Sequence, residues 1–309
     1  GMLLSNLPMI KDSSDIMMHT EFFTNPEYMT DGKYINVGYI CQHGGLLDLL
    51  YLGVKLGIYP PLIFVGIGCM TDFGPLIANP KSILLGAAAQ FGVFFTFVGA
   101  LVLSALVPSI NFGIKEAASI GIIGGADGPT AIYVTKSLAP ALLPAIAVAA
   151  YSYMALIPVI QPPIMKLMTR KKDRMIVMEQ LRPVSKTEKI LFPIIVTIIV
   201  ALIIPDAVSL VGCLMLGNLM KESGVVERLT KMAQNELMNI ITLFLGVTVG
   251  ATATASSFLS AQTIGIIVLG LIAFCFSTVG GLFLGDIMCW VTKGKVNPLI
   301  GSAGVSAVP

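Results

Sequence analysis

Long apolar runs without a charged residue are the feature that most constrains how this chain can fold. Such runs occupy residues 82–107, 139–160, 190–205 and 256–285. A helix needs about 20 apolar residues to cross the hydrocarbon core of a bilayer, and these runs approach or exceed that length. The whole chain is 55% hydrophobic and only 12% charged, which is far too apolar for a soluble domain of this size. The sequence therefore predicts an all-α polytopic membrane protein.

The charged residues are concentrated in one segment between two of these runs. Residues 166–189 contain eight basic and three acidic side chains, a net charge of +5, whereas the whole chain has +2. By the positive-inside rule we expect this loop to be cytoplasmic. A nucleic-acid-binding role is disfavoured, because the basic run is short and joins two apolar spans. The five cysteines form no CxxC pair, so we expect neither a disulfide framework nor a metal cluster.

A lone carboxylate interrupts an otherwise apolar stretch in the motif Gly-Gly-Ala-Asp-Gly-Pro-Thr at residues 124–130. An ionisable group at membrane depth is costly, and broken helix at that depth normally occurs only where it lines a site. Proline favours the first turn of a helix, so Asp127 is expected near the N-cap of a helix that restarts at Pro129. Simple capping is the alternative interpretation of Asp127, but its membrane depth favours a functional role.

The chemistry of this motif suits a small hard cation. Unwound backbone at Gly124 and Gly125 offers carbonyl oxygens, and Asp127 adds a charged oxygen. Na⁺ and H⁺ can then compete for the same carboxylate. In the next apolar run, the hydroxyls of Tyr151 and Tyr153 lie in mid-span and need partners within the protein. Tyr153 could supply a ligand oxygen or a proton.

The end of the chain repeats the pattern of this motif. Adding 180 to each position pairs Ile120 with Ile300, Gly124 with Gly304 and Pro129 with Pro309, and each copy follows a long uncharged run. Paired interrupted segments in corresponding halves point to a transporter-type binding site. Asn297, Ser302 and Ser306 supply neutral oxygens in the second copy, with helix capping as their alternative role. Because the second copy stops halfway, we expect the chain to be a piece of a longer protein.

We therefore predict two membrane repeats with broken, re-entrant hairpins. An extramembrane region at 1–45 precedes a first repeat at 46–165 with its hairpin at 111–137, and the basic loop 166–189 leads to a second repeat at 190–309 that is incomplete at its C-terminal end.

Three segments together resemble the membrane β-subunits of the sodium-pumping biotin-dependent decarboxylases, which comprise the oxaloacetate, methylmalonyl-CoA, glutaconyl-CoA and malonate enzymes. They are the motif at 124–130, the ending Asn-Pro-Leu-Ile-Gly-Ser-Ala-Gly-Val-Ser-Ala-Val-Pro at 297–309, and residues 76–81 together with 86–92. The resemblance covers nearly the whole chain. It implies two inverted repeats with helical hairpins that move in an elevator-like step, in the bacterial cytoplasmic membrane.

The resemblance also implies an activity. A separate carboxyltransferase loads a biotin carrier, and the β-subunit decarboxylates the carboxybiotin, consumes a proton and exports Na⁺. Asp127 would be the Na⁺/H⁺ site, and Tyr153, Asn297, Gly301 and Ser306 match other positions used for Na⁺ binding or proton delivery. Family members assemble as a trimer of β-subunits with a small γ- or δ-type subunit. Because the chain contains no Met-Lys-Met biotinylation motif, carboxybiotin would be presented in trans.

Two rival functions remain at this stage. A Na⁺-coupled secondary carboxylate transporter would use the same broken helices without decarboxylation, and a purely structural anchor would leave the buried Asp127 unexplained. The sequence does not indicate which acyl substrate the parent complex decarboxylates, because that choice lies in another subunit.

Overall fold

The computed structural model describes residues 29–30, 34–178, 182–253 and 260–304. The regular structure of these residues is helical, as predicted, apart from one short antiparallel pair between β1 (Met29–Thr30) and β2 (Tyr34–Ile35). The helices up to the basic loop are α3 (Val37–His43), α4 (Leu46–Lys55), α5 (Tyr59–Met70), α6 (Gly74–Ala78), η3 (Pro80–Ser82), α7 (Ile83–Ala89), α8 (Phe91–Leu106), α9 (Ile114–Gly121), η4 (Ile122–Gly125), α10 (Gly128–Leu138), η5 (Pro140–Leu142) and α11 (Leu143–Met168).

The later helices begin with a short 3₁₀ turn inside the basic loop. They are η6 (Asp173–Met175), α12 (Lys186–Ile203), η7 (Pro205–Ala207), α13 (Val208–Ser223), α14 (Glu227–Met232), the π-helix η8 (Ala233–Leu237), α15 (Met238–Ala251), α17 (Ala261–Val291) and η9 (Pro298–Gly304).

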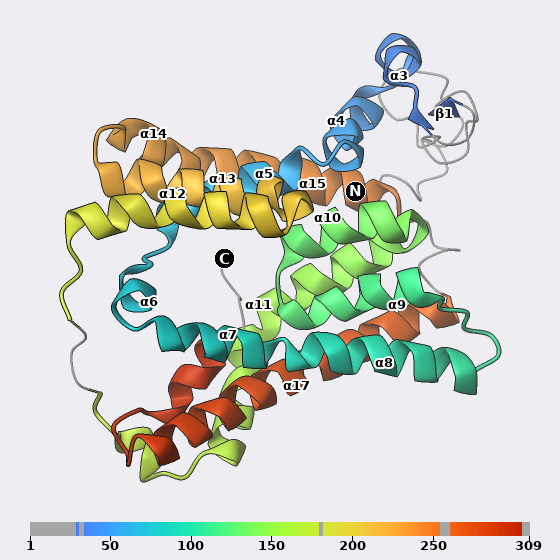
Figure 1. Ribbon diagram of the computed structural model, residues 1–309. Coiled ribbons are helices and arrows are strands. Elements are labelled where there is room, and N and C mark those ends of the chain that lie inside the picture. The colour runs from blue at the N-terminus through green and yellow to red at the C-terminus, as the bar shows by residue number, and fades with distance from the viewer. Residues whose placement is uncertain (1–28, 31–33, 179–181, 254–259, 305–309) are drawn as a thin grey trace.

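The helices form two layers (Figure 1). In this view α5, α12, α13, α14 and α15 lie in the upper layer, and α7, α8, α9 and α17 lie in the lower one, with α10 and α11 between them. One buried apolar cluster joins α8, α9, η4, α10, α11 and α17. A second cluster joins α3, α4, α5, α10, α11 and α15. Helices α10 and α11 therefore contribute to both cores.

Several helices have the length and composition of membrane spans. Among the described residues, Pro80–Leu106 and Ala261–Val291 qualify as continuous spans, which agrees with two of the predicted apolar runs. Two bent pairs qualify as broken spans: α4 with α5, bent by 68°, and the two parts of Pro140–Met168, bent by 60°. Pro158, Pro162 and Pro163 lie inside α11, where each removes a backbone hydrogen bond and favours a bend.

Glycines allow the backbones of neighbouring helices to approach closely. Gly68 of α5 faces the backbone of Leu214 in α13, and Gly217 of α13 faces the backbone of Val65 in α5, so neither position has room for a Cβ atom. Such small-residue contacts are typical of helix packing in membranes. They explain why this Gly-rich sequence forms tightly packed helix pairs.

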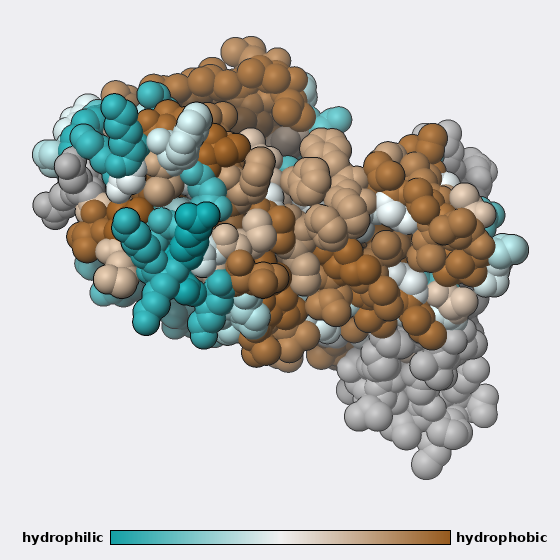
Figure 2. Space-filling view, turned by 90° about the horizontal axis from the view of Figure 1, so that it is seen from below, coloured by the Kyte–Doolittle hydropathy of each residue, from teal (hydrophilic) through white to brown (hydrophobic). Residues whose placement is uncertain are grey.

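Apolar side chains cover much of the surface. Figure 2 shows a face on which hydrophobic residues occupy the middle and hydrophilic residues gather mainly at one end. Exposed large side chains include Phe94 on α8, Leu202 on α12 and Phe283 on α17. This distribution is expected for helices whose outer faces contact lipid rather than water.

Candidate ion site

The first broken helix has the predicted form. Helix α9 passes into the 3₁₀ turn η4, and the chain then reverses through Ala126 and Asp127 into α10. Ala126 adopts the left-handed conformation (φ 55°, ψ 34°), although the two glycines before it could do so at lower cost. Strained backbone of this kind is characteristic of functional sites. The reversal places the Asp127 side chain at the N-terminus of α10.

Asp127 caps α10, and only part of its hydrogen-bonding capacity is used for this. Its Oδ1 accepts a hydrogen bond from the backbone N–H of Thr130 at 3.1 Å, and its Oδ2 accepts one from the Thr130 hydroxyl at 2.6 Å. Pro129 lies in the first turn, as predicted. An ionised carboxylate offers about four acceptor positions, so each oxygen can still bind a cation.

The η4 turn is held against α17 by a buried serine. The Ser277 hydroxyl, which is 0% exposed, donates a hydrogen bond to the Gly124 carbonyl oxygen at 2.5 Å. A Cβ atom on Gly124 would lie 2.7 Å from the carbonyl carbon of Gly92, so α8 also touches this turn. The Gly124 carbonyl, which was predicted as an ion ligand, therefore already accepts one hydrogen bond from the protein. Its oxygen keeps one further lone pair.

The second predicted segment meets the same helix one turn away. Gly301 of η9 lies against the backbone of Gly281, too close for a Cβ atom on either residue. Gly281 follows Ser277 by four residues on α17, so the two contacts share a face and are separated by about 6 Å along the axis. The structure therefore brings Gly124 and Gly301 to neighbouring places on α17.

The side-chain amide of Asn297 has partners both in η9 and in the basic loop. Its Oδ1 accepts a hydrogen bond from the Leu299 N–H at 3.0 Å, and its Nδ2 donates to the carbonyls of Arg174 at 3.3 Å and Ile176 at 3.0 Å. The amide thus caps η9 and ties it to the basic loop. Ser302 donates to the Leu299 carbonyl at 2.7 Å, while Ser306 lies outside the described residues.

The two candidate tyrosines of α11 face different neighbours. The Tyr153 hydroxyl donates to the carbonyl of Ile267 in α17, and its ring packs over Gly270. Tyr151 packs against the cluster shared by α4, α5, α10 and α15. Gly125, the last residue of η4, is half-buried, and a Cβ atom there would lie 4.0 Å from the Gln90 Oε1. Gln90 lies at the break between α7 and α8.

The comparisons with known proteins show the family of this chain. The family model of the Na⁺-transporting oxaloacetate decarboxylase beta subunit matches residues 1–309. The chain belongs to this family. Its relatives include a methylmalonyl-CoA decarboxylase subunit beta from Propionigenium modestum, 57% identical over 309 residues, which covers 100% of this chain and 76% of the relative.

Two further relatives have other substrates in their names. An oxaloacetate decarboxylase beta chain from Klebsiella pneumoniae is 58% identical over 276 residues, or 89% of this chain and 63% of the relative. A glutaconyl-CoA decarboxylase subunit beta from Acidaminococcus fermentans is 58% identical over 265 residues, or 86% of this chain and 69% of the relative. The chain thus spans between 63% and 76% of these relatives. Membership confirms the predicted family and supports a membrane subunit of a decarboxylase sodium pump rather than a secondary carboxylate transporter.

Sequence reasoning missed two residues that hold the broken helices of this chain in place. Ser277 is one hydroxyl within a 31-residue apolar helix, and its contact with Gly124 spans 153 residues. Gln161, whose amide donates to the Ser302 carbonyl at 2.9 Å, was missed for the same reason. A polar side chain within an apolar span was the available signal, but it does not identify the partner.

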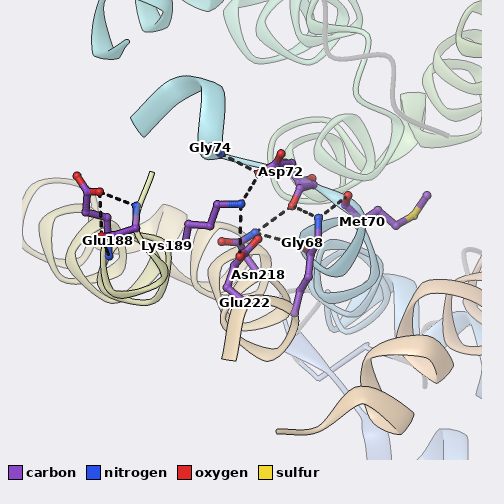
Figure 3. A network of polar contacts seen from close by, with 11 residues as sticks. Gly68, Met70, Asp72, Gly74, Glu188, Lys189, Asn218 and Glu222 are labelled. Atoms are coloured by element: carbon purple, nitrogen blue, oxygen red, sulfur yellow. Dashed lines mark hydrogen bonds and ion pairs between the residues drawn. The ribbon is translucent and has the colours of Figure 1, made fainter. Parts of the chain in front are cut away.

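A second polar cluster lies at the end of α5 (Figure 3). The Thr71 carbonyl accepts hydrogen bonds from Asn218 Nδ2 and from Lys221 Nζ, each at 3.0 Å. Lys189 pairs with Asp72 at 3.4 Å and with Glu222 at 3.7 Å. The Gly74 N–H and then Lys189 lower the pKa of the Asp72 carboxyl. Lys189 and Lys221 already bind the oxygens of this cluster. The cluster therefore anchors the helix ends rather than forming a cation site.

The donors at Asp127 suit Na⁺ rather than a transition metal. Within the described part of the chain, no three His, Cys, Asp or Glu side chains gather closely enough to hold a metal ion. One carboxylate with carbonyl and hydroxyl oxygens is instead the kind of site that a hard cation prefers. The residues present therefore fit Na⁺ as a transported substrate.

Proposed function

We propose that this chain decarboxylates carboxybiotin and uses the reaction to export Na⁺ through a site centred on Asp127. The carboxybiotin would be delivered in trans by a biotin carrier that a separate carboxyltransferase loads. A small γ- or δ-type membrane subunit and two further β-subunits would complete the complex in the bacterial cytoplasmic membrane. Family membership supports these partners, because a beta subunit is named as one part of a multisubunit decarboxylase.

The observation that carries the proposal is a carboxylate at a broken helix that is packed against a second broken segment. Asp127 follows η4, which contacts α17 at Ser277, and η9 contacts α17 one turn later at Gly281. The ends of half-helices and the unwound backbone between them are where transporters of this kind bind ions. Asp127, Gly124, Gly125, Tyr153, Asn297, Gly301 and Ser306 remain the proposed ion-site residues.

Helix directions support two inverted repeats. An offset of 180 residues places α5 over α15 and α8 over α17. Helices α8 and α17 run antiparallel, because Gly99 lies near Leu269 while Phe91 lies near Gly280. The proposed boundaries, 46–165 and 190–309 on either side of the loop 166–189, follow from this offset.

The same relation holds for the other pair. Gly66 contacts Met238, whereas the ring of Tyr59, earlier in α5, lies 6.4 Å from the ring of Phe244, later in α15. Helices α5 and α15 are therefore antiparallel too. Equivalent helices of two repeats that run in opposite directions are what an inverted duplication requires.

The two broken segments also enter from opposite ends of α17. Asn111, just before α9, accepts a hydrogen bond from Gln262 at the start of α17, at 3.5 Å. Asn297, just before η9, is bonded to the basic loop near the other end of α17. With the basic loop in the cytoplasm, the first hairpin would open outward and the second inward. An elevator-like movement of the hairpins would then expose Asp127 to each side in turn.

The chemistry requires one proton for each decarboxylation. Breaking the bond between the biotin nitrogen and the carboxyl carbon releases CO₂, and the nitrogen takes up a proton. Asp127 can hold either that proton or Na⁺, but not both, which links uptake of the proton to release of the ion. Moving one Na⁺ against 100 mV requires roughly 2.3 kcal/mol.

Asp127→Asn in the full complex tests the proposal. Asparagine caps a helix about as well as aspartate, so the fold of α10 should persist while the charge is lost. We expect Na⁺-dependent decarboxylation of carboxybiotin and ²²Na⁺ transport into proteoliposomes to disappear. The matched control is Asp206→Asn, which removes an exposed carboxylate of η7. Full Na⁺-dependent activity in Asp127→Asn would refute the assignment.

A further inference from the structure

Tyr151 and Tyr153 lie on opposite sides of α11. Two residues of an α-helix are about 200° apart, so the two side chains point away from each other. Tyr153 reaches α17, where its hydroxyl donates to the Ile267 carbonyl. Tyr151 instead packs against the buried cluster that α4, α5, α10 and α15 share, to which α10 contributes Ile132. The Tyr151 side chain is therefore directed toward a core that includes the helix capped by Asp127.

The Tyr151 hydroxyl is buried and lacks a hydrogen-bond partner among the residues that the structure describes. A buried hydroxyl without a partner destabilises the fold. Such groups are rare in native structures, and each one needs an explanation, such as a ligand that binds there. A phenylalanine at position 151 would fill the same space without this cost.

Asp127 is the ion-site residue that can account for the unpartnered Tyr151 hydroxyl. The Asp127 carboxylate lies near the Tyr151 hydroxyl, although no hydrogen bond joins the two groups. Thr130 supplies one hydrogen bond to each Asp127 oxygen, which leaves acceptor positions on both. A phenol can donate its hydrogen to a carboxylate, and its oxygen lone pair can bind a cation.

We propose that the Tyr151 hydroxyl is a further member of the ion site, where its oxygen binds Na⁺ together with Asp127. The inference rests on the proposed function, because it assumes that Asp127 binds Na⁺. The bound ion would then provide the partner that the buried hydroxyl lacks among the described residues.

Thr135 provides a matched control. Its hydroxyl is also buried and without a partner in the described part of the chain, and it lies on α10, eight residues beyond Asp127. Eight residues correspond to about 12 Å along the helix, which is out of reach of the carboxylate. Tyr151→Phe and Thr135→Val therefore each remove one unpartnered buried hydroxyl, but only the first removes it from the ion site.

The experiment measures Na⁺ affinity of the purified full complex in two ways: ²²Na⁺ binding, and the rise in unfolding temperature with Na⁺ concentration against a K⁺ reference. We expect Tyr151→Phe to weaken Na⁺ binding about tenfold or more, as for loss of one bond to a charged partner. Its unfolding temperature without Na⁺ should stay unchanged or rise, because no hydrogen bond is lost. Thr135→Val should leave Na⁺ affinity unchanged.

Three outcomes would overturn the inference: unchanged Na⁺ affinity in Tyr151→Phe, equal weakening in Thr135→Val, or a strong loss of stability without Na⁺, which would show that the hydroxyl has a structural partner. Asp127→Asn separates this failure from failure of the proposed function. If Asp127→Asn abolishes Na⁺ binding and Tyr151→Phe does not affect it, only the role of Tyr151 is wrong. If Asp127→Asn still binds Na⁺ normally, the proposed function fails as well.

Discussion

The two broken segments, η4 and η9, meet the same face of α17 but are held there differently. The η4 turn is bonded to a neighbouring helix, where Ser277 donates to the Gly124 carbonyl. The η9 turn is bonded to the basic loop, where Asn297 donates to two backbone carbonyls. A carboxylate follows η4, whereas the described part of η9 carries only neutral polar groups.

This difference assigns separate tasks to two segments that the sequence presents as copies. The first holds its charge in a fixed position, through a left-handed residue and a capped helix. The second is held through its bonds to the basic loop. We infer that the first segment determines ion affinity, and that the second transmits the state of the loop to the ion site.

The largest expected effect comes from adding a methyl group where η9 touches α17. In Gly301→Ala the new Cβ atom would overlap the Gly281 backbone, which cannot move aside as a side chain could. Overpacking of this kind costs about 3 kcal/mol, so the unfolding temperature of the complex should fall by several degrees. Gly86→Ala is the control, because no atom lies within 4 Å of its Cβ position. Equal unfolding temperatures for the two variants would mean that η9 does not pack on α17 as described.

The corresponding test for the first segment removes its anchor. Ser277→Ala leaves the buried Gly124 carbonyl without its hydroxyl partner, which should cost about 2 kcal/mol. The exposed Ser137, whose hydroxyl bonds only within its own helix, is the control position. Thermal unfolding measures both variants. If the segments have separate tasks, Ser277→Ala should also weaken Na⁺ binding, and an effect on protease sensitivity of the basic loop alone would contradict this.

These two contacts show what the sequence could and could not predict. Apolar runs, glycines and prolines follow from local chemistry, so two continuous spans, the break at 122–127 and the cap at Asp127 were predicted at nearly their observed positions. Ser277 and Gln161 were not predicted, because their partners lie 153 and 141 residues away. A sequence pattern indicates which helices have a polar or small residue, but not where two helices cross.

Ala126 illustrates a local feature that was also missed. The motif contains two glycines before it, which are the residues expected to adopt a left-handed conformation, yet the alanine does so. Contacts of the neighbouring residues determine which residue is left-handed. Gly124 packs against the backbone of Gly92, where no side chain fits. Close packing thus places the left-handed residue one position later than propensity alone would.

Asn297→Ala tests the anchor of the second segment. The substitution removes the cap of η9 and two hydrogen bonds to the loop, and we expect a loss of about 1 kcal/mol. Asn297→Asp keeps the acceptor for the Leu299 N–H but lacks the donors to Arg174 and Ile176. Faster trypsin cleavage within residues 166–189 should therefore occur in both variants. Cleavage that is faster only in Asn297→Ala would indicate that capping, not the loop contact, is what matters.

Ala126→Gly should have a smaller and opposite effect. Glycine adopts φ of 55° without the penalty of a Cβ atom, which is about 1 kcal/mol, although its greater freedom in the unfolded chain offsets part of this gain. We expect a slightly higher unfolding temperature together with weaker Na⁺ binding, because a freer backbone holds Asp127 less firmly. A clear drop in unfolding temperature would show that Ala126 contributes more by packing than it costs in strain.

The smallest expected effect concerns the ion pair at the end of the basic loop. Arg182, at 2.8 Å, and then the Ser185 backbone lower the pKa of Glu188 from 4.5 to about 2. Because the folded-state pKa is lower than that of the unfolded chain, the pair stabilises the fold above about pH 4.5, and this contribution is lost as the pH falls toward 2. Both side chains are well exposed, so the effect on unfolding should be slight.

Glu188→Gln should reduce the fall in unfolding temperature between about pH 4.5 and 2. At neutral pH it should speed trypsin cleavage of the basic loop without changing Na⁺ affinity. Glu227→Gln, which breaks the exposed pair with Lys231 on α14, is the control and should not affect loop cleavage. A change in Na⁺ affinity in Glu188→Gln would show that the loop reaches the first segment as well as the second.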